Sequence, residues 1–259
     1  MAQVVAISKT AHGDKKWKRY ESYDHAKRDA VAPLTIQELV RASKIMPICF
    51  IKMGEGYLPA ALQSLVPNIN LFVAPNGKWV GGYTPACYRS YPFLLAKAEE
   101  GKTLLCADMD SGLIGDEGEP LFVDGEPAKE VTELLGFLNA VQANREASER
   151  VCAVLAKHEL ITPWELKVKT SEGEKPVQGL YRIDETALNS LPAEALAEVR
   201  DGGGLPVAFC QLLSIQNLPV LAQLAKLHEK PQEPEADVLV DENGELDLEF
   251  MNDGGTIKF

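Results

Sequence analysis

The stretch Asn68–Gly125 decides the fold and reads NINLFVAPNGKWVGGYTPACYRSYPFLLAKAEEGKTLLCADMDSGLIGDEGEPLFVDG. Near its start, the apolar runs 71–73 and 79–80 flank Pro75-Asn76-Gly77. Glycine accepts the positive φ that a tight reversal requires, so this pattern predicts a hairpin. Further along, the apolar run 103–107 predicts a buried strand that ends in an acidic turn.

Residues 81–93 separate the predicted hairpin from that strand, and they combine four aromatic rings with Pro85 and Pro92. Each proline removes a backbone donor and pushes the preceding residue toward extended geometry. We therefore expect a stiff, irregular passage here. At the end of the stretch, residues 120–123 followed by Asp124-Gly125 predict another strand and turn.

Outside this stretch the chain alternates between helical and extended patterns. Apolar residues at three- and four-residue steps predict a long helix over 129–160, with a possible bend near Asn144. Further helices are expected at 32–43, where Thr35 and Glu38 form a capping box, and at 59–65, 192–200 and 217–227. Strands are expected at 47–51, 160–168 and 179–183, and the apolar run 205–215 is expected in the core. The mixture predicts an α+β fold, with one domain of hairpins, sheet and packed helices over residues 1–230.

Residues 231–259 form a separate acidic C-terminal segment. Pro231 and Pro234 end the last predicted helix, and acidic residues dominate beyond them. Apolar and acidic residues alternate around Asn243-Gly244, which predicts a terminal hairpin. This segment would either dock on the domain or serve as an attachment arm.

The net charge of −12, from 26 basic and 38 acidic residues, argues against nucleic acid or an anionic membrane as a partner. No run of about 18 apolar residues is evident, so no transmembrane helix is expected. Residues 1–9 carry no charge before their short apolar run, which is not typical of a secretory signal. Hence we expect a cytoplasmic protein.

The five cysteines are odd in number, widely spaced and mostly set in apolar surroundings, with Cys106 and Cys210 as examples. They predict buried, reduced thiols rather than a disulfide framework. No ligand spacing of a zinc site occurs, so no metal and no cofactor is predicted. The glycines at 54, 56 and 202–204 lack the pattern of a phosphate-binding loop, and the last group is expected to end a helix.

A distinctive set of residues consists of Tyr83-Thr84-Pro85-Ala86, Arg89, Tyr91-Pro92-Phe93 and Cys106-Ala107-Asp108. Through these residues the chain resembles the SapC family of bacterial proteins, and the resemblance covers roughly residues 15–229. It implies no catalytic residues, and the family name, taken from a surface-layer gene locus, implies a surface-layer-associated structural role as one alternative. Ser90 stands where the family pattern would place a second arginine, which weakens any two-arginine anion clamp there.

The side chains that we select as a candidate ligand or partner surface are Trp79, Tyr83, Tyr88, Arg89, Tyr91 and Asp108. Aromatic rings beside an arginine are enriched at recognition surfaces, so we favour a non-catalytic binding or accessory protein whose ligand and oligomeric state the sequence does not identify. Alternatively, these rings fill the core, and Arg89 pairs with Asp108 or Asp110.

A second reading is an enzyme that uses Asp108 and Asp110 with His25 or Arg89, because paired carboxylates can act as acid and base. An ordinary turn also explains the two aspartates. The basic and aromatic residues of 15–23 could contact a phosphate or a partner, or pack onto the domain, which is the interpretation we favour.

Overall fold

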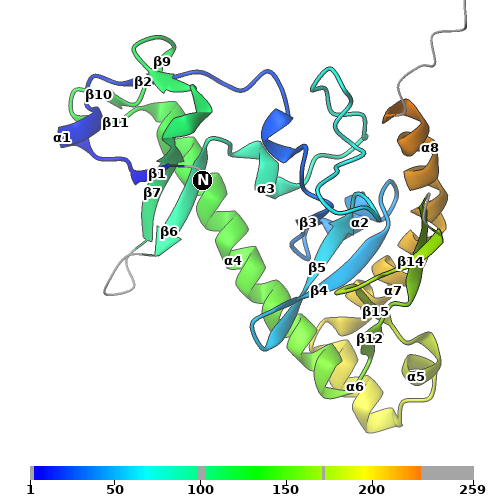
Figure 1. The fold of residues 1–259 in the computed structure, drawn as a ribbon. Helices are drawn as coiled ribbons and strands as arrows, with labels where there is room; N and C mark the ends of the chain where they lie inside the picture. Colours follow the sequence, from blue (N-terminus) through cyan, green and yellow to red (C-terminus); the bar gives the residue numbers. More distant parts are fainter. Residues whose placement is uncertain (1–2, 98–102, 171–172, 229–259) are drawn as a thin grey trace, which may run out of the picture.

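The structure, a computed structural model, describes residues 3–97, 103–170 and 173–228. A 29-residue helix, α4 (Lys129–Lys157), extends from one part of the molecule to the other (Figure 1). The helix is continuous past Asn144, so the long predicted helix is confirmed without a bend. Near its N-terminus Val131 and Leu138 enter one hydrophobic cluster, and near its C-terminus Cys152 and Leu155 enter another. Two lobes therefore share one helix within a single α+β domain.

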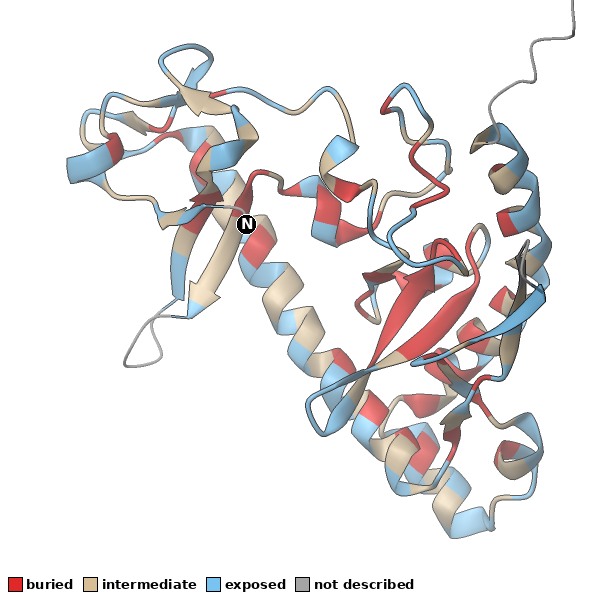
Figure 2. Ribbon diagram, in the orientation of Figure 1, coloured by how far each residue is buried: buried red, intermediate tan, exposed pale blue. Residues whose placement is uncertain are grey.

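The larger lobe contains a five-stranded antiparallel sheet with the strand order β12-β15-β4-β5-β3. Its strands are β3 (Val31–Pro33), β4 (Ile48–Met53), β5 (Gly56–Leu62), β12 (Ile161–Pro163) and β15 (Tyr181–Ile183). The centre of the sheet is buried, most clearly along β4 and β5 (Figure 2).

The helical prediction for residues 59–65 is wrong. Residues 59–62 belong to β5, which pairs with β4 in the register Ile48↔Ala61 to Met53↔Gly56, and residues 63–65 are not helical. A short apolar run has the same hydrophobic signal in a buried strand as in a buried helix, and here the partner strand decides.

Five helices complete the larger lobe: α2 (Leu39–Ala42), α5 (Glu185–Asn189), α6 (Ala193–Asp201), α7 (Gly204–Ser214) and α8 (Leu218–His228). Helix α6 ends at Asp201, so the glycine run ends a helix as predicted, and Gly203 is the N-cap of α7 with φ 75°.

Helix α7 is joined to the sheet by two buried polar side chains. Gln211 accepts from the Ile183 amide at 3.0 Å and donates to the Ile48 carbonyl at 3.1 Å. Ser214 Oγ accepts from the Ile48 amide at 2.8 Å. These bonds satisfy backbone groups that would otherwise be buried without partners.

Within the described residues, the segment Gly204–His228 is long and apolar enough to cross a membrane by length and composition, with a mean hydropathy of 1.5 in its most apolar window. By this criterion the expectation that no apolar stretch of this length occurs is wrong. The segment contains the 3₁₀ turn Ile215–Asn217, and its side chains at Val207, Leu221 and Leu224 are buried in the larger core. Phe209 is exposed on the outer side.

The smaller lobe contains short strands. One sheet has the order β1-β7-β6, with β1 (Val4–Ala6), β6 (Phe93–Lys97) and β7 (Thr103–Asp108). A second joins β2 (Lys16–Trp17) to β8 (Ile114–Gly115) and β9 (Glu119–Pro120), and a two-stranded hairpin joins β10 (Phe122–Val123) to β11 (Glu126–Pro127). Helix α1 (Lys9–His12) lies at its edge. The predicted strand 103–107 is therefore confirmed, but of these residues only Cys106 and Ala107 are buried.

Turn predictions were more accurate than the lengths of the elements around them. Asp124 and Gly125 turn between β10 and β11 with φ of 50° and 82°. Gly77 also has a positive φ, 79°, but the strands expected around it reduce to a single bridge, Val73↔Trp79. In the larger lobe, β13 (Leu166–Thr170) and β14 (Gly173–Val177) form a hairpin.

Three of the five free cysteines, Cys49, Cys106 and Cys152, are buried, whereas Cys210 is half-buried and Cys87 is exposed. Burial raises the pKa of Cys49 to about 12. The expectation of a buried thiol thus holds for Cys106 but not fully for Cys210. The hairpin predicted in 231–259 lies outside the described residues.

Candidate functional site

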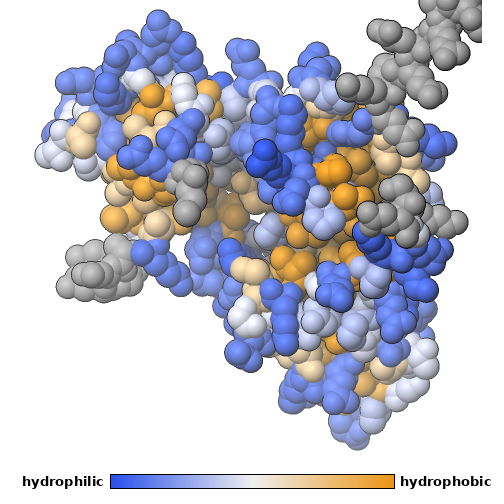
Figure 3. Space-filling model, in the orientation of Figure 1, coloured by the Kyte–Doolittle hydropathy of each residue, from blue (hydrophilic) through white to orange (hydrophobic). Residues whose placement is uncertain are grey.

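An open groove of about 580 Å³ is lined by side chains of both lobes. Figure 3 shows the two lobes as separate masses with a gap between them. Three segments of the chain line this interlobe groove, and their side chains are Trp17, Arg19, Tyr20 and Tyr23; Arg89, Ser90 and Tyr91; and Glu130, Glu133, Leu134 and Phe137. The first two segments lie mostly outside regular secondary structure, although Trp17 belongs to β2 and Arg89 to a short helix. The third segment is one face of α4.

Trp17 forms the inner end of the first segment. It lies on β2, 7% exposed, and its ring meets Phe93 edge-on at 5.2 Å. The guanidinium of Arg19 lies 5.8 Å from the centre of the Trp17 ring, within the range of a cation–π contact. The buried Nε1–H of Trp17 has no acceptor among the described residues. Buried donors normally have partners, so this unpaired indole N–H is an exception in the smaller lobe.

Four rings pack together along one wall of the groove. Tyr20 meets Tyr23 at 5.2 Å and His25 at 5.1 Å, and His25 stacks on Tyr91 at 4.0 Å with the planes 4° apart. Burial lowers the pKa of His25, because the charged imidazolium loses contact with water. Burial and the Tyr23 hydroxyl raise the pKa of Tyr20. This wall is therefore uncharged near neutral pH.

Arg89 ends the short helix α3 (Ala86–Arg89) and crosses the groove toward α4. Its guanidinium carbon lies 5.2 Å from the centre of the Phe137 ring and 5.8 Å from that of Tyr83, and Nη2 donates to the Tyr83 hydroxyl at 3.4 Å. Across the described residues Arg89 and Arg19 form no ion pair with a carboxylate. The alternative in which Arg89 pairs with Asp108 or Asp110 is therefore not observed.

The position of Arg89 depends on the buried carboxylate of Glu38, which is 5% exposed. One oxygen accepts from the Tyr83 hydroxyl at 2.9 Å and the Ala86 amide at 2.7 Å. The other accepts from the Thr35 amide at 2.8 Å and the Thr35 hydroxyl at 3.0 Å. Four donors thus compensate for burying this charge, and they fix the start of α3.

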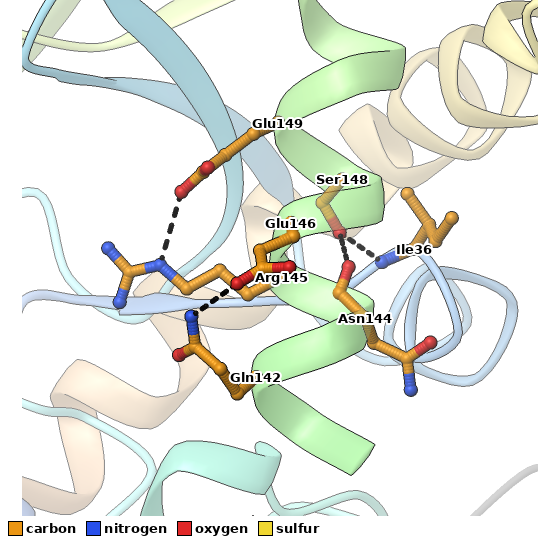
Figure 4. A network of polar contacts seen from close by, with 7 residues as sticks. All are labelled: Ile36, Gln142, Asn144, Arg145, Glu146, Ser148 and Glu149. Carbon is orange, nitrogen blue, oxygen red and sulfur yellow. Dashed lines mark hydrogen bonds and ion pairs between the residues drawn. The ribbon is translucent and has the colours of Figure 1, made fainter. Parts of the chain in front are cut away.

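The turn that carries Glu38 is attached to α4 by Ser148 (Figure 4). Ser148 is fully buried, and its hydroxyl accepts from the Ile36 amide at 2.9 Å and donates to the Asn144 carbonyl at 2.7 Å. The predicted capping interaction between Thr35 and Glu38 exists, but the regular helix begins only at Leu39. Because Glu38 also binds Tyr83 and Ala86, the turn serves as an anchor for the groove rather than as the start of a long helix.

The α4 wall of the groove changes character along the helix axis. Glu130 and Glu133 lie near its N-terminus, followed by the apolar Leu134 and Phe137. Glu133 pairs with Lys129 at 3.8 Å, with both side chains largely exposed. Glu130 forms no ion pair with a residue in the described part of the chain. Acidic side chains also suit a helix N-terminus, so these two positions have a structural explanation as well.

Asp108 and Asp110 do not line the interlobe groove. Asp108 accepts from the Asp110 amide at 3.0 Å and from the Tyr91 hydroxyl at 3.4 Å, and Asp110 accepts from the Gln3 amide at 3.0 Å. They form a 3₁₀ turn, Met109–Ser111. No group of three or more metal-ligating side chains occurs in residues 3–97, 103–170 and 173–228. The arrangement supports the turn rather than acid–base chemistry.

Two of the side chains selected from the sequence, Arg89 and Tyr91, line the groove, and Tyr83 and Asp108 contact them. The other two lie in the larger core. Tyr88 is 5% exposed and donates to Gln63 at 2.9 Å, and Trp79 stacks on Phe72 and donates to the Tyr83 carbonyl.

The first and third segments of the groove were not selected from the sequence. The basic and aromatic pattern of residues 15–23 favours packing onto the domain, whereas the structure places Trp17, Arg19, Tyr20 and Tyr23 in the groove lining. Nothing in the pattern of α4 marks Glu130 or Phe137, because the helix alternates charged and apolar residues along its whole length.

Comparison with known families identifies the chain, since the SapC family model matches residues 7–221 of 259. The chain belongs to the SapC family. The matched region of this SapC protein contains every residue that lines the interlobe groove, and it confirms the resemblance seen in the sequence. No curated protein and no solved structure showed a significant match to the chain.

Proposed function

We propose that this SapC-family protein is a non-catalytic binding or accessory protein whose ligand site is the interlobe groove. The observation that carries the proposal is the pair of guanidinium groups, Arg19 and Arg89, that face an aromatic-walled cavity without a carboxylate partner in the described residues. Arginine held against a ring keeps its fork of donors available for a carboxylate or a phosphate. A ligand acceptor would complete these contacts.

The size and rigidity of the groove also support binding. Pockets for small ligands range from about 300 to 1,000 Å³, and this one has about 580 Å³. The bonds from Glu38 hold Tyr83 and the start of α3 in place before any ligand arrives. Side chains that are already ordered lose less conformational entropy on binding, so the same contacts produce a higher affinity.

The enzyme alternative has weaker support. Asp108 and Asp110 are occupied by turn hydrogen bonds and lie outside the groove lining. His25 stacks on Tyr91, and burial lowers its pKa, but no carboxylate or nucleophile forms a hydrogen bond with it in the described part of the chain. A general base must reach the proton that it removes.

The proposal can be tested through the three tryptophan indole N–H signals in a nitrogen-15 NMR spectrum. Trp17 lines the groove, whereas Trp79 and Trp164 do not, and a Trp17→Phe variant assigns the signal. The intact protein is titrated with a panel of aromatic carboxylates, nucleotides and short peptides. A groove ligand should shift the Trp17 signal and leave Trp164 unchanged.

Two variants make the test specific. Arg89→Gln should abolish the response, and Arg150→Gln, which changes an exposed arginine of α4 outside the groove, should retain it. A panel in which no compound moves the Trp17 signal would contradict the proposal. So would a response that Arg89→Gln leaves intact.

A further inference from the structure

The interlobe groove has acidic side chains at one end and an arginine at the other. This arrangement restricts which ligands can bind, an inference that rests on the function proposed above. Glu130 and Glu133 lie at one end of the α4 wall, and Arg89 lies against Phe137 at the other. Seven residues separate Glu130 from Phe137, which corresponds to about 10 Å along a helix axis. Leu134 lies between these ends on the helix, and the rings of Trp17, Tyr20, Tyr23 and Tyr91 line the other sides of the groove.

We propose that the groove binds a short, extended peptide-like zwitterion. Its carboxylate would meet Arg89, its cationic group would meet Glu130 and Glu133, and an apolar side chain would lie on the rings between them. A tripeptide in extended conformation spans about 10 Å, because each residue adds about 3.3–3.6 Å, which matches the separation of the two ends.

A peptide also fits the middle of the groove. The rings of Trp17, Tyr20 and Tyr91 line it, and an apolar side chain of a peptide can pack against them. A simple anion would satisfy Arg89 but would leave Glu130 at the other end without a cationic partner. A ligand that carries both charges would give each end of the groove a partner.

The competing explanation is that Glu130 and Glu133 only stabilise the N-terminus of α4, where acidic side chains interact favourably with the helix dipole. In that case their removal would change stability but not the choice of ligand. Glu194 provides a matched control, because it is an exposed acidic residue in the first turn of α6, away from the groove.

The test uses four forms of the tripeptide Ala-Phe-Ala: both termini free, N-acetylated, C-amidated, and blocked at both ends. Each is titrated into the intact protein while the Trp17 indole signal is followed. The free form should bind most tightly. Each block should weaken binding roughly tenfold, the size expected for loss of one charge-assisted hydrogen bond.

The variants should remove these preferences one at a time. Glu130→Gln with Glu133→Gln should no longer distinguish the free from the acetylated peptide, and Arg89→Gln should no longer distinguish the free from the amidated one. Glu194→Gln should keep both preferences. A free tripeptide and an internal segment of a partner chain offer the same charges. A longer peptide that is blocked at both ends, with Lys and Asp side chains two residues apart, therefore represents the internal segment. Tighter binding of this peptide would identify a partner chain as the ligand, and tighter binding of the free tripeptide would identify a short peptide.

The outcomes separate this inference from the function on which it rests. If all four tripeptides bind equally, or if only other compounds shift Trp17, the peptide-like zwitterion is rejected and the groove remains a binding site. If the tripeptides bind without moving Trp17 and the wider panel also fails to move it, both proposals are rejected.

Discussion

The two lobes bury their interiors in different ways. The larger lobe surrounds a five-stranded sheet, and polar side chains such as Gln211 and Ser214 complete backbone hydrogen bonds inside it. In the described residues the smaller core has seven buried side chains beneath strands of two to six residues. Elements with few buried contacts open more easily. The groove thus combines a firm wall from the larger lobe with a wall that has less packing behind it.

The largest effect on stability is expected when a buried polar contact of the larger core is removed. Gln211→Leu should lower the free energy of unfolding by about 2–5 kcal/mol, because the Ile183 amide and the Ile48 carbonyl would both lose a buried partner. Urea denaturation measures this change. Gln223→Leu, an exposed position on α8, is the control and should alter stability little. Similar losses in both variants would show that the buried bonds are not the cause.

The smaller core should respond locally. Leu121 is fully buried in it, and Leu121→Ala should cost about 2–5 kcal/mol through lost packing and a cavity. Hydrogen exchange should then show that the amides of β6 and β7 lose protection while those of β4 and β5 keep it. Equal loss in both sheets would break the comparison, because it would mean that α4 couples the lobes into one cooperative unit.

The sequence predicted many of the helices, strands and turns of the two lobes, but not all of them. The three- and four-residue spacing of apolar side chains located α4, and glycine located the turns at Gly77, Gly125 and Gly203. What failed was the distinction between strand and helix at 59–65, because that depends on pairing with β4, a non-local event. A local sequence pattern is often compatible with more than one secondary structure, and contacts with distant segments determine which one forms.

The site was less predictable than the fold for the same reason. Arg89 and Tyr91 stood out through their aromatic and proline-rich neighbours, but the groove also needs Trp17 and Phe137, which are far away in the chain. Nor could the sequence show that Glu38 would leave its local turn to bind Tyr83 and Ala86. Contacts between distant segments create the cavity, and no single stretch contains its pattern.

Glu38 links the larger lobe to the groove, so its replacement tests whether the firm wall matters for the site. Glu38→Gln keeps the shape but replaces one acceptor oxygen with a donor, which opposes at least one of the four donors. We expect a loss of about 1–3 kcal/mol in the free energy of unfolding, the cost of leaving a buried donor without its charged partner. Thermal or urea denaturation measures it.

The same variant should also disturb Arg89 at a distance. Because the Tyr83 hydroxyl joins Glu38 to Arg89, binding of any groove ligand should weaken together with stability. Glu149→Gln, which changes a carboxylate in an exposed ion pair on α4, is the control, and surface pairs of this kind contribute about 0–1 kcal/mol. Lower stability with unchanged affinity would show that the anchor and the site are independent.

Arg89→Lys should have the smallest effect on stability and a clear effect on binding. The side chain is exposed and forms no ion pair with a described residue, so its replacement leaves no buried charge without a partner, and a change below about 0.5 kcal/mol is expected. A lysine keeps the charge but loses the planar fork and its stacking on Phe137. Binding of a carboxylate ligand should therefore weaken by roughly 1.5–3 kcal/mol.

Measuring melting and binding on the same Arg89→Lys protein distinguishes a functional from a structural arginine. Arg150→Lys, on the exposed side of α4, should change neither quantity. A lowered melting temperature with unchanged affinity would assign Arg89 to the fold, where its contacts with Tyr83 and Phe137 would join the lobes across the groove. Unchanged melting with weaker binding would place its contribution in the ligand contact, because a side chain that stabilises only the complex leaves the free protein unaffected.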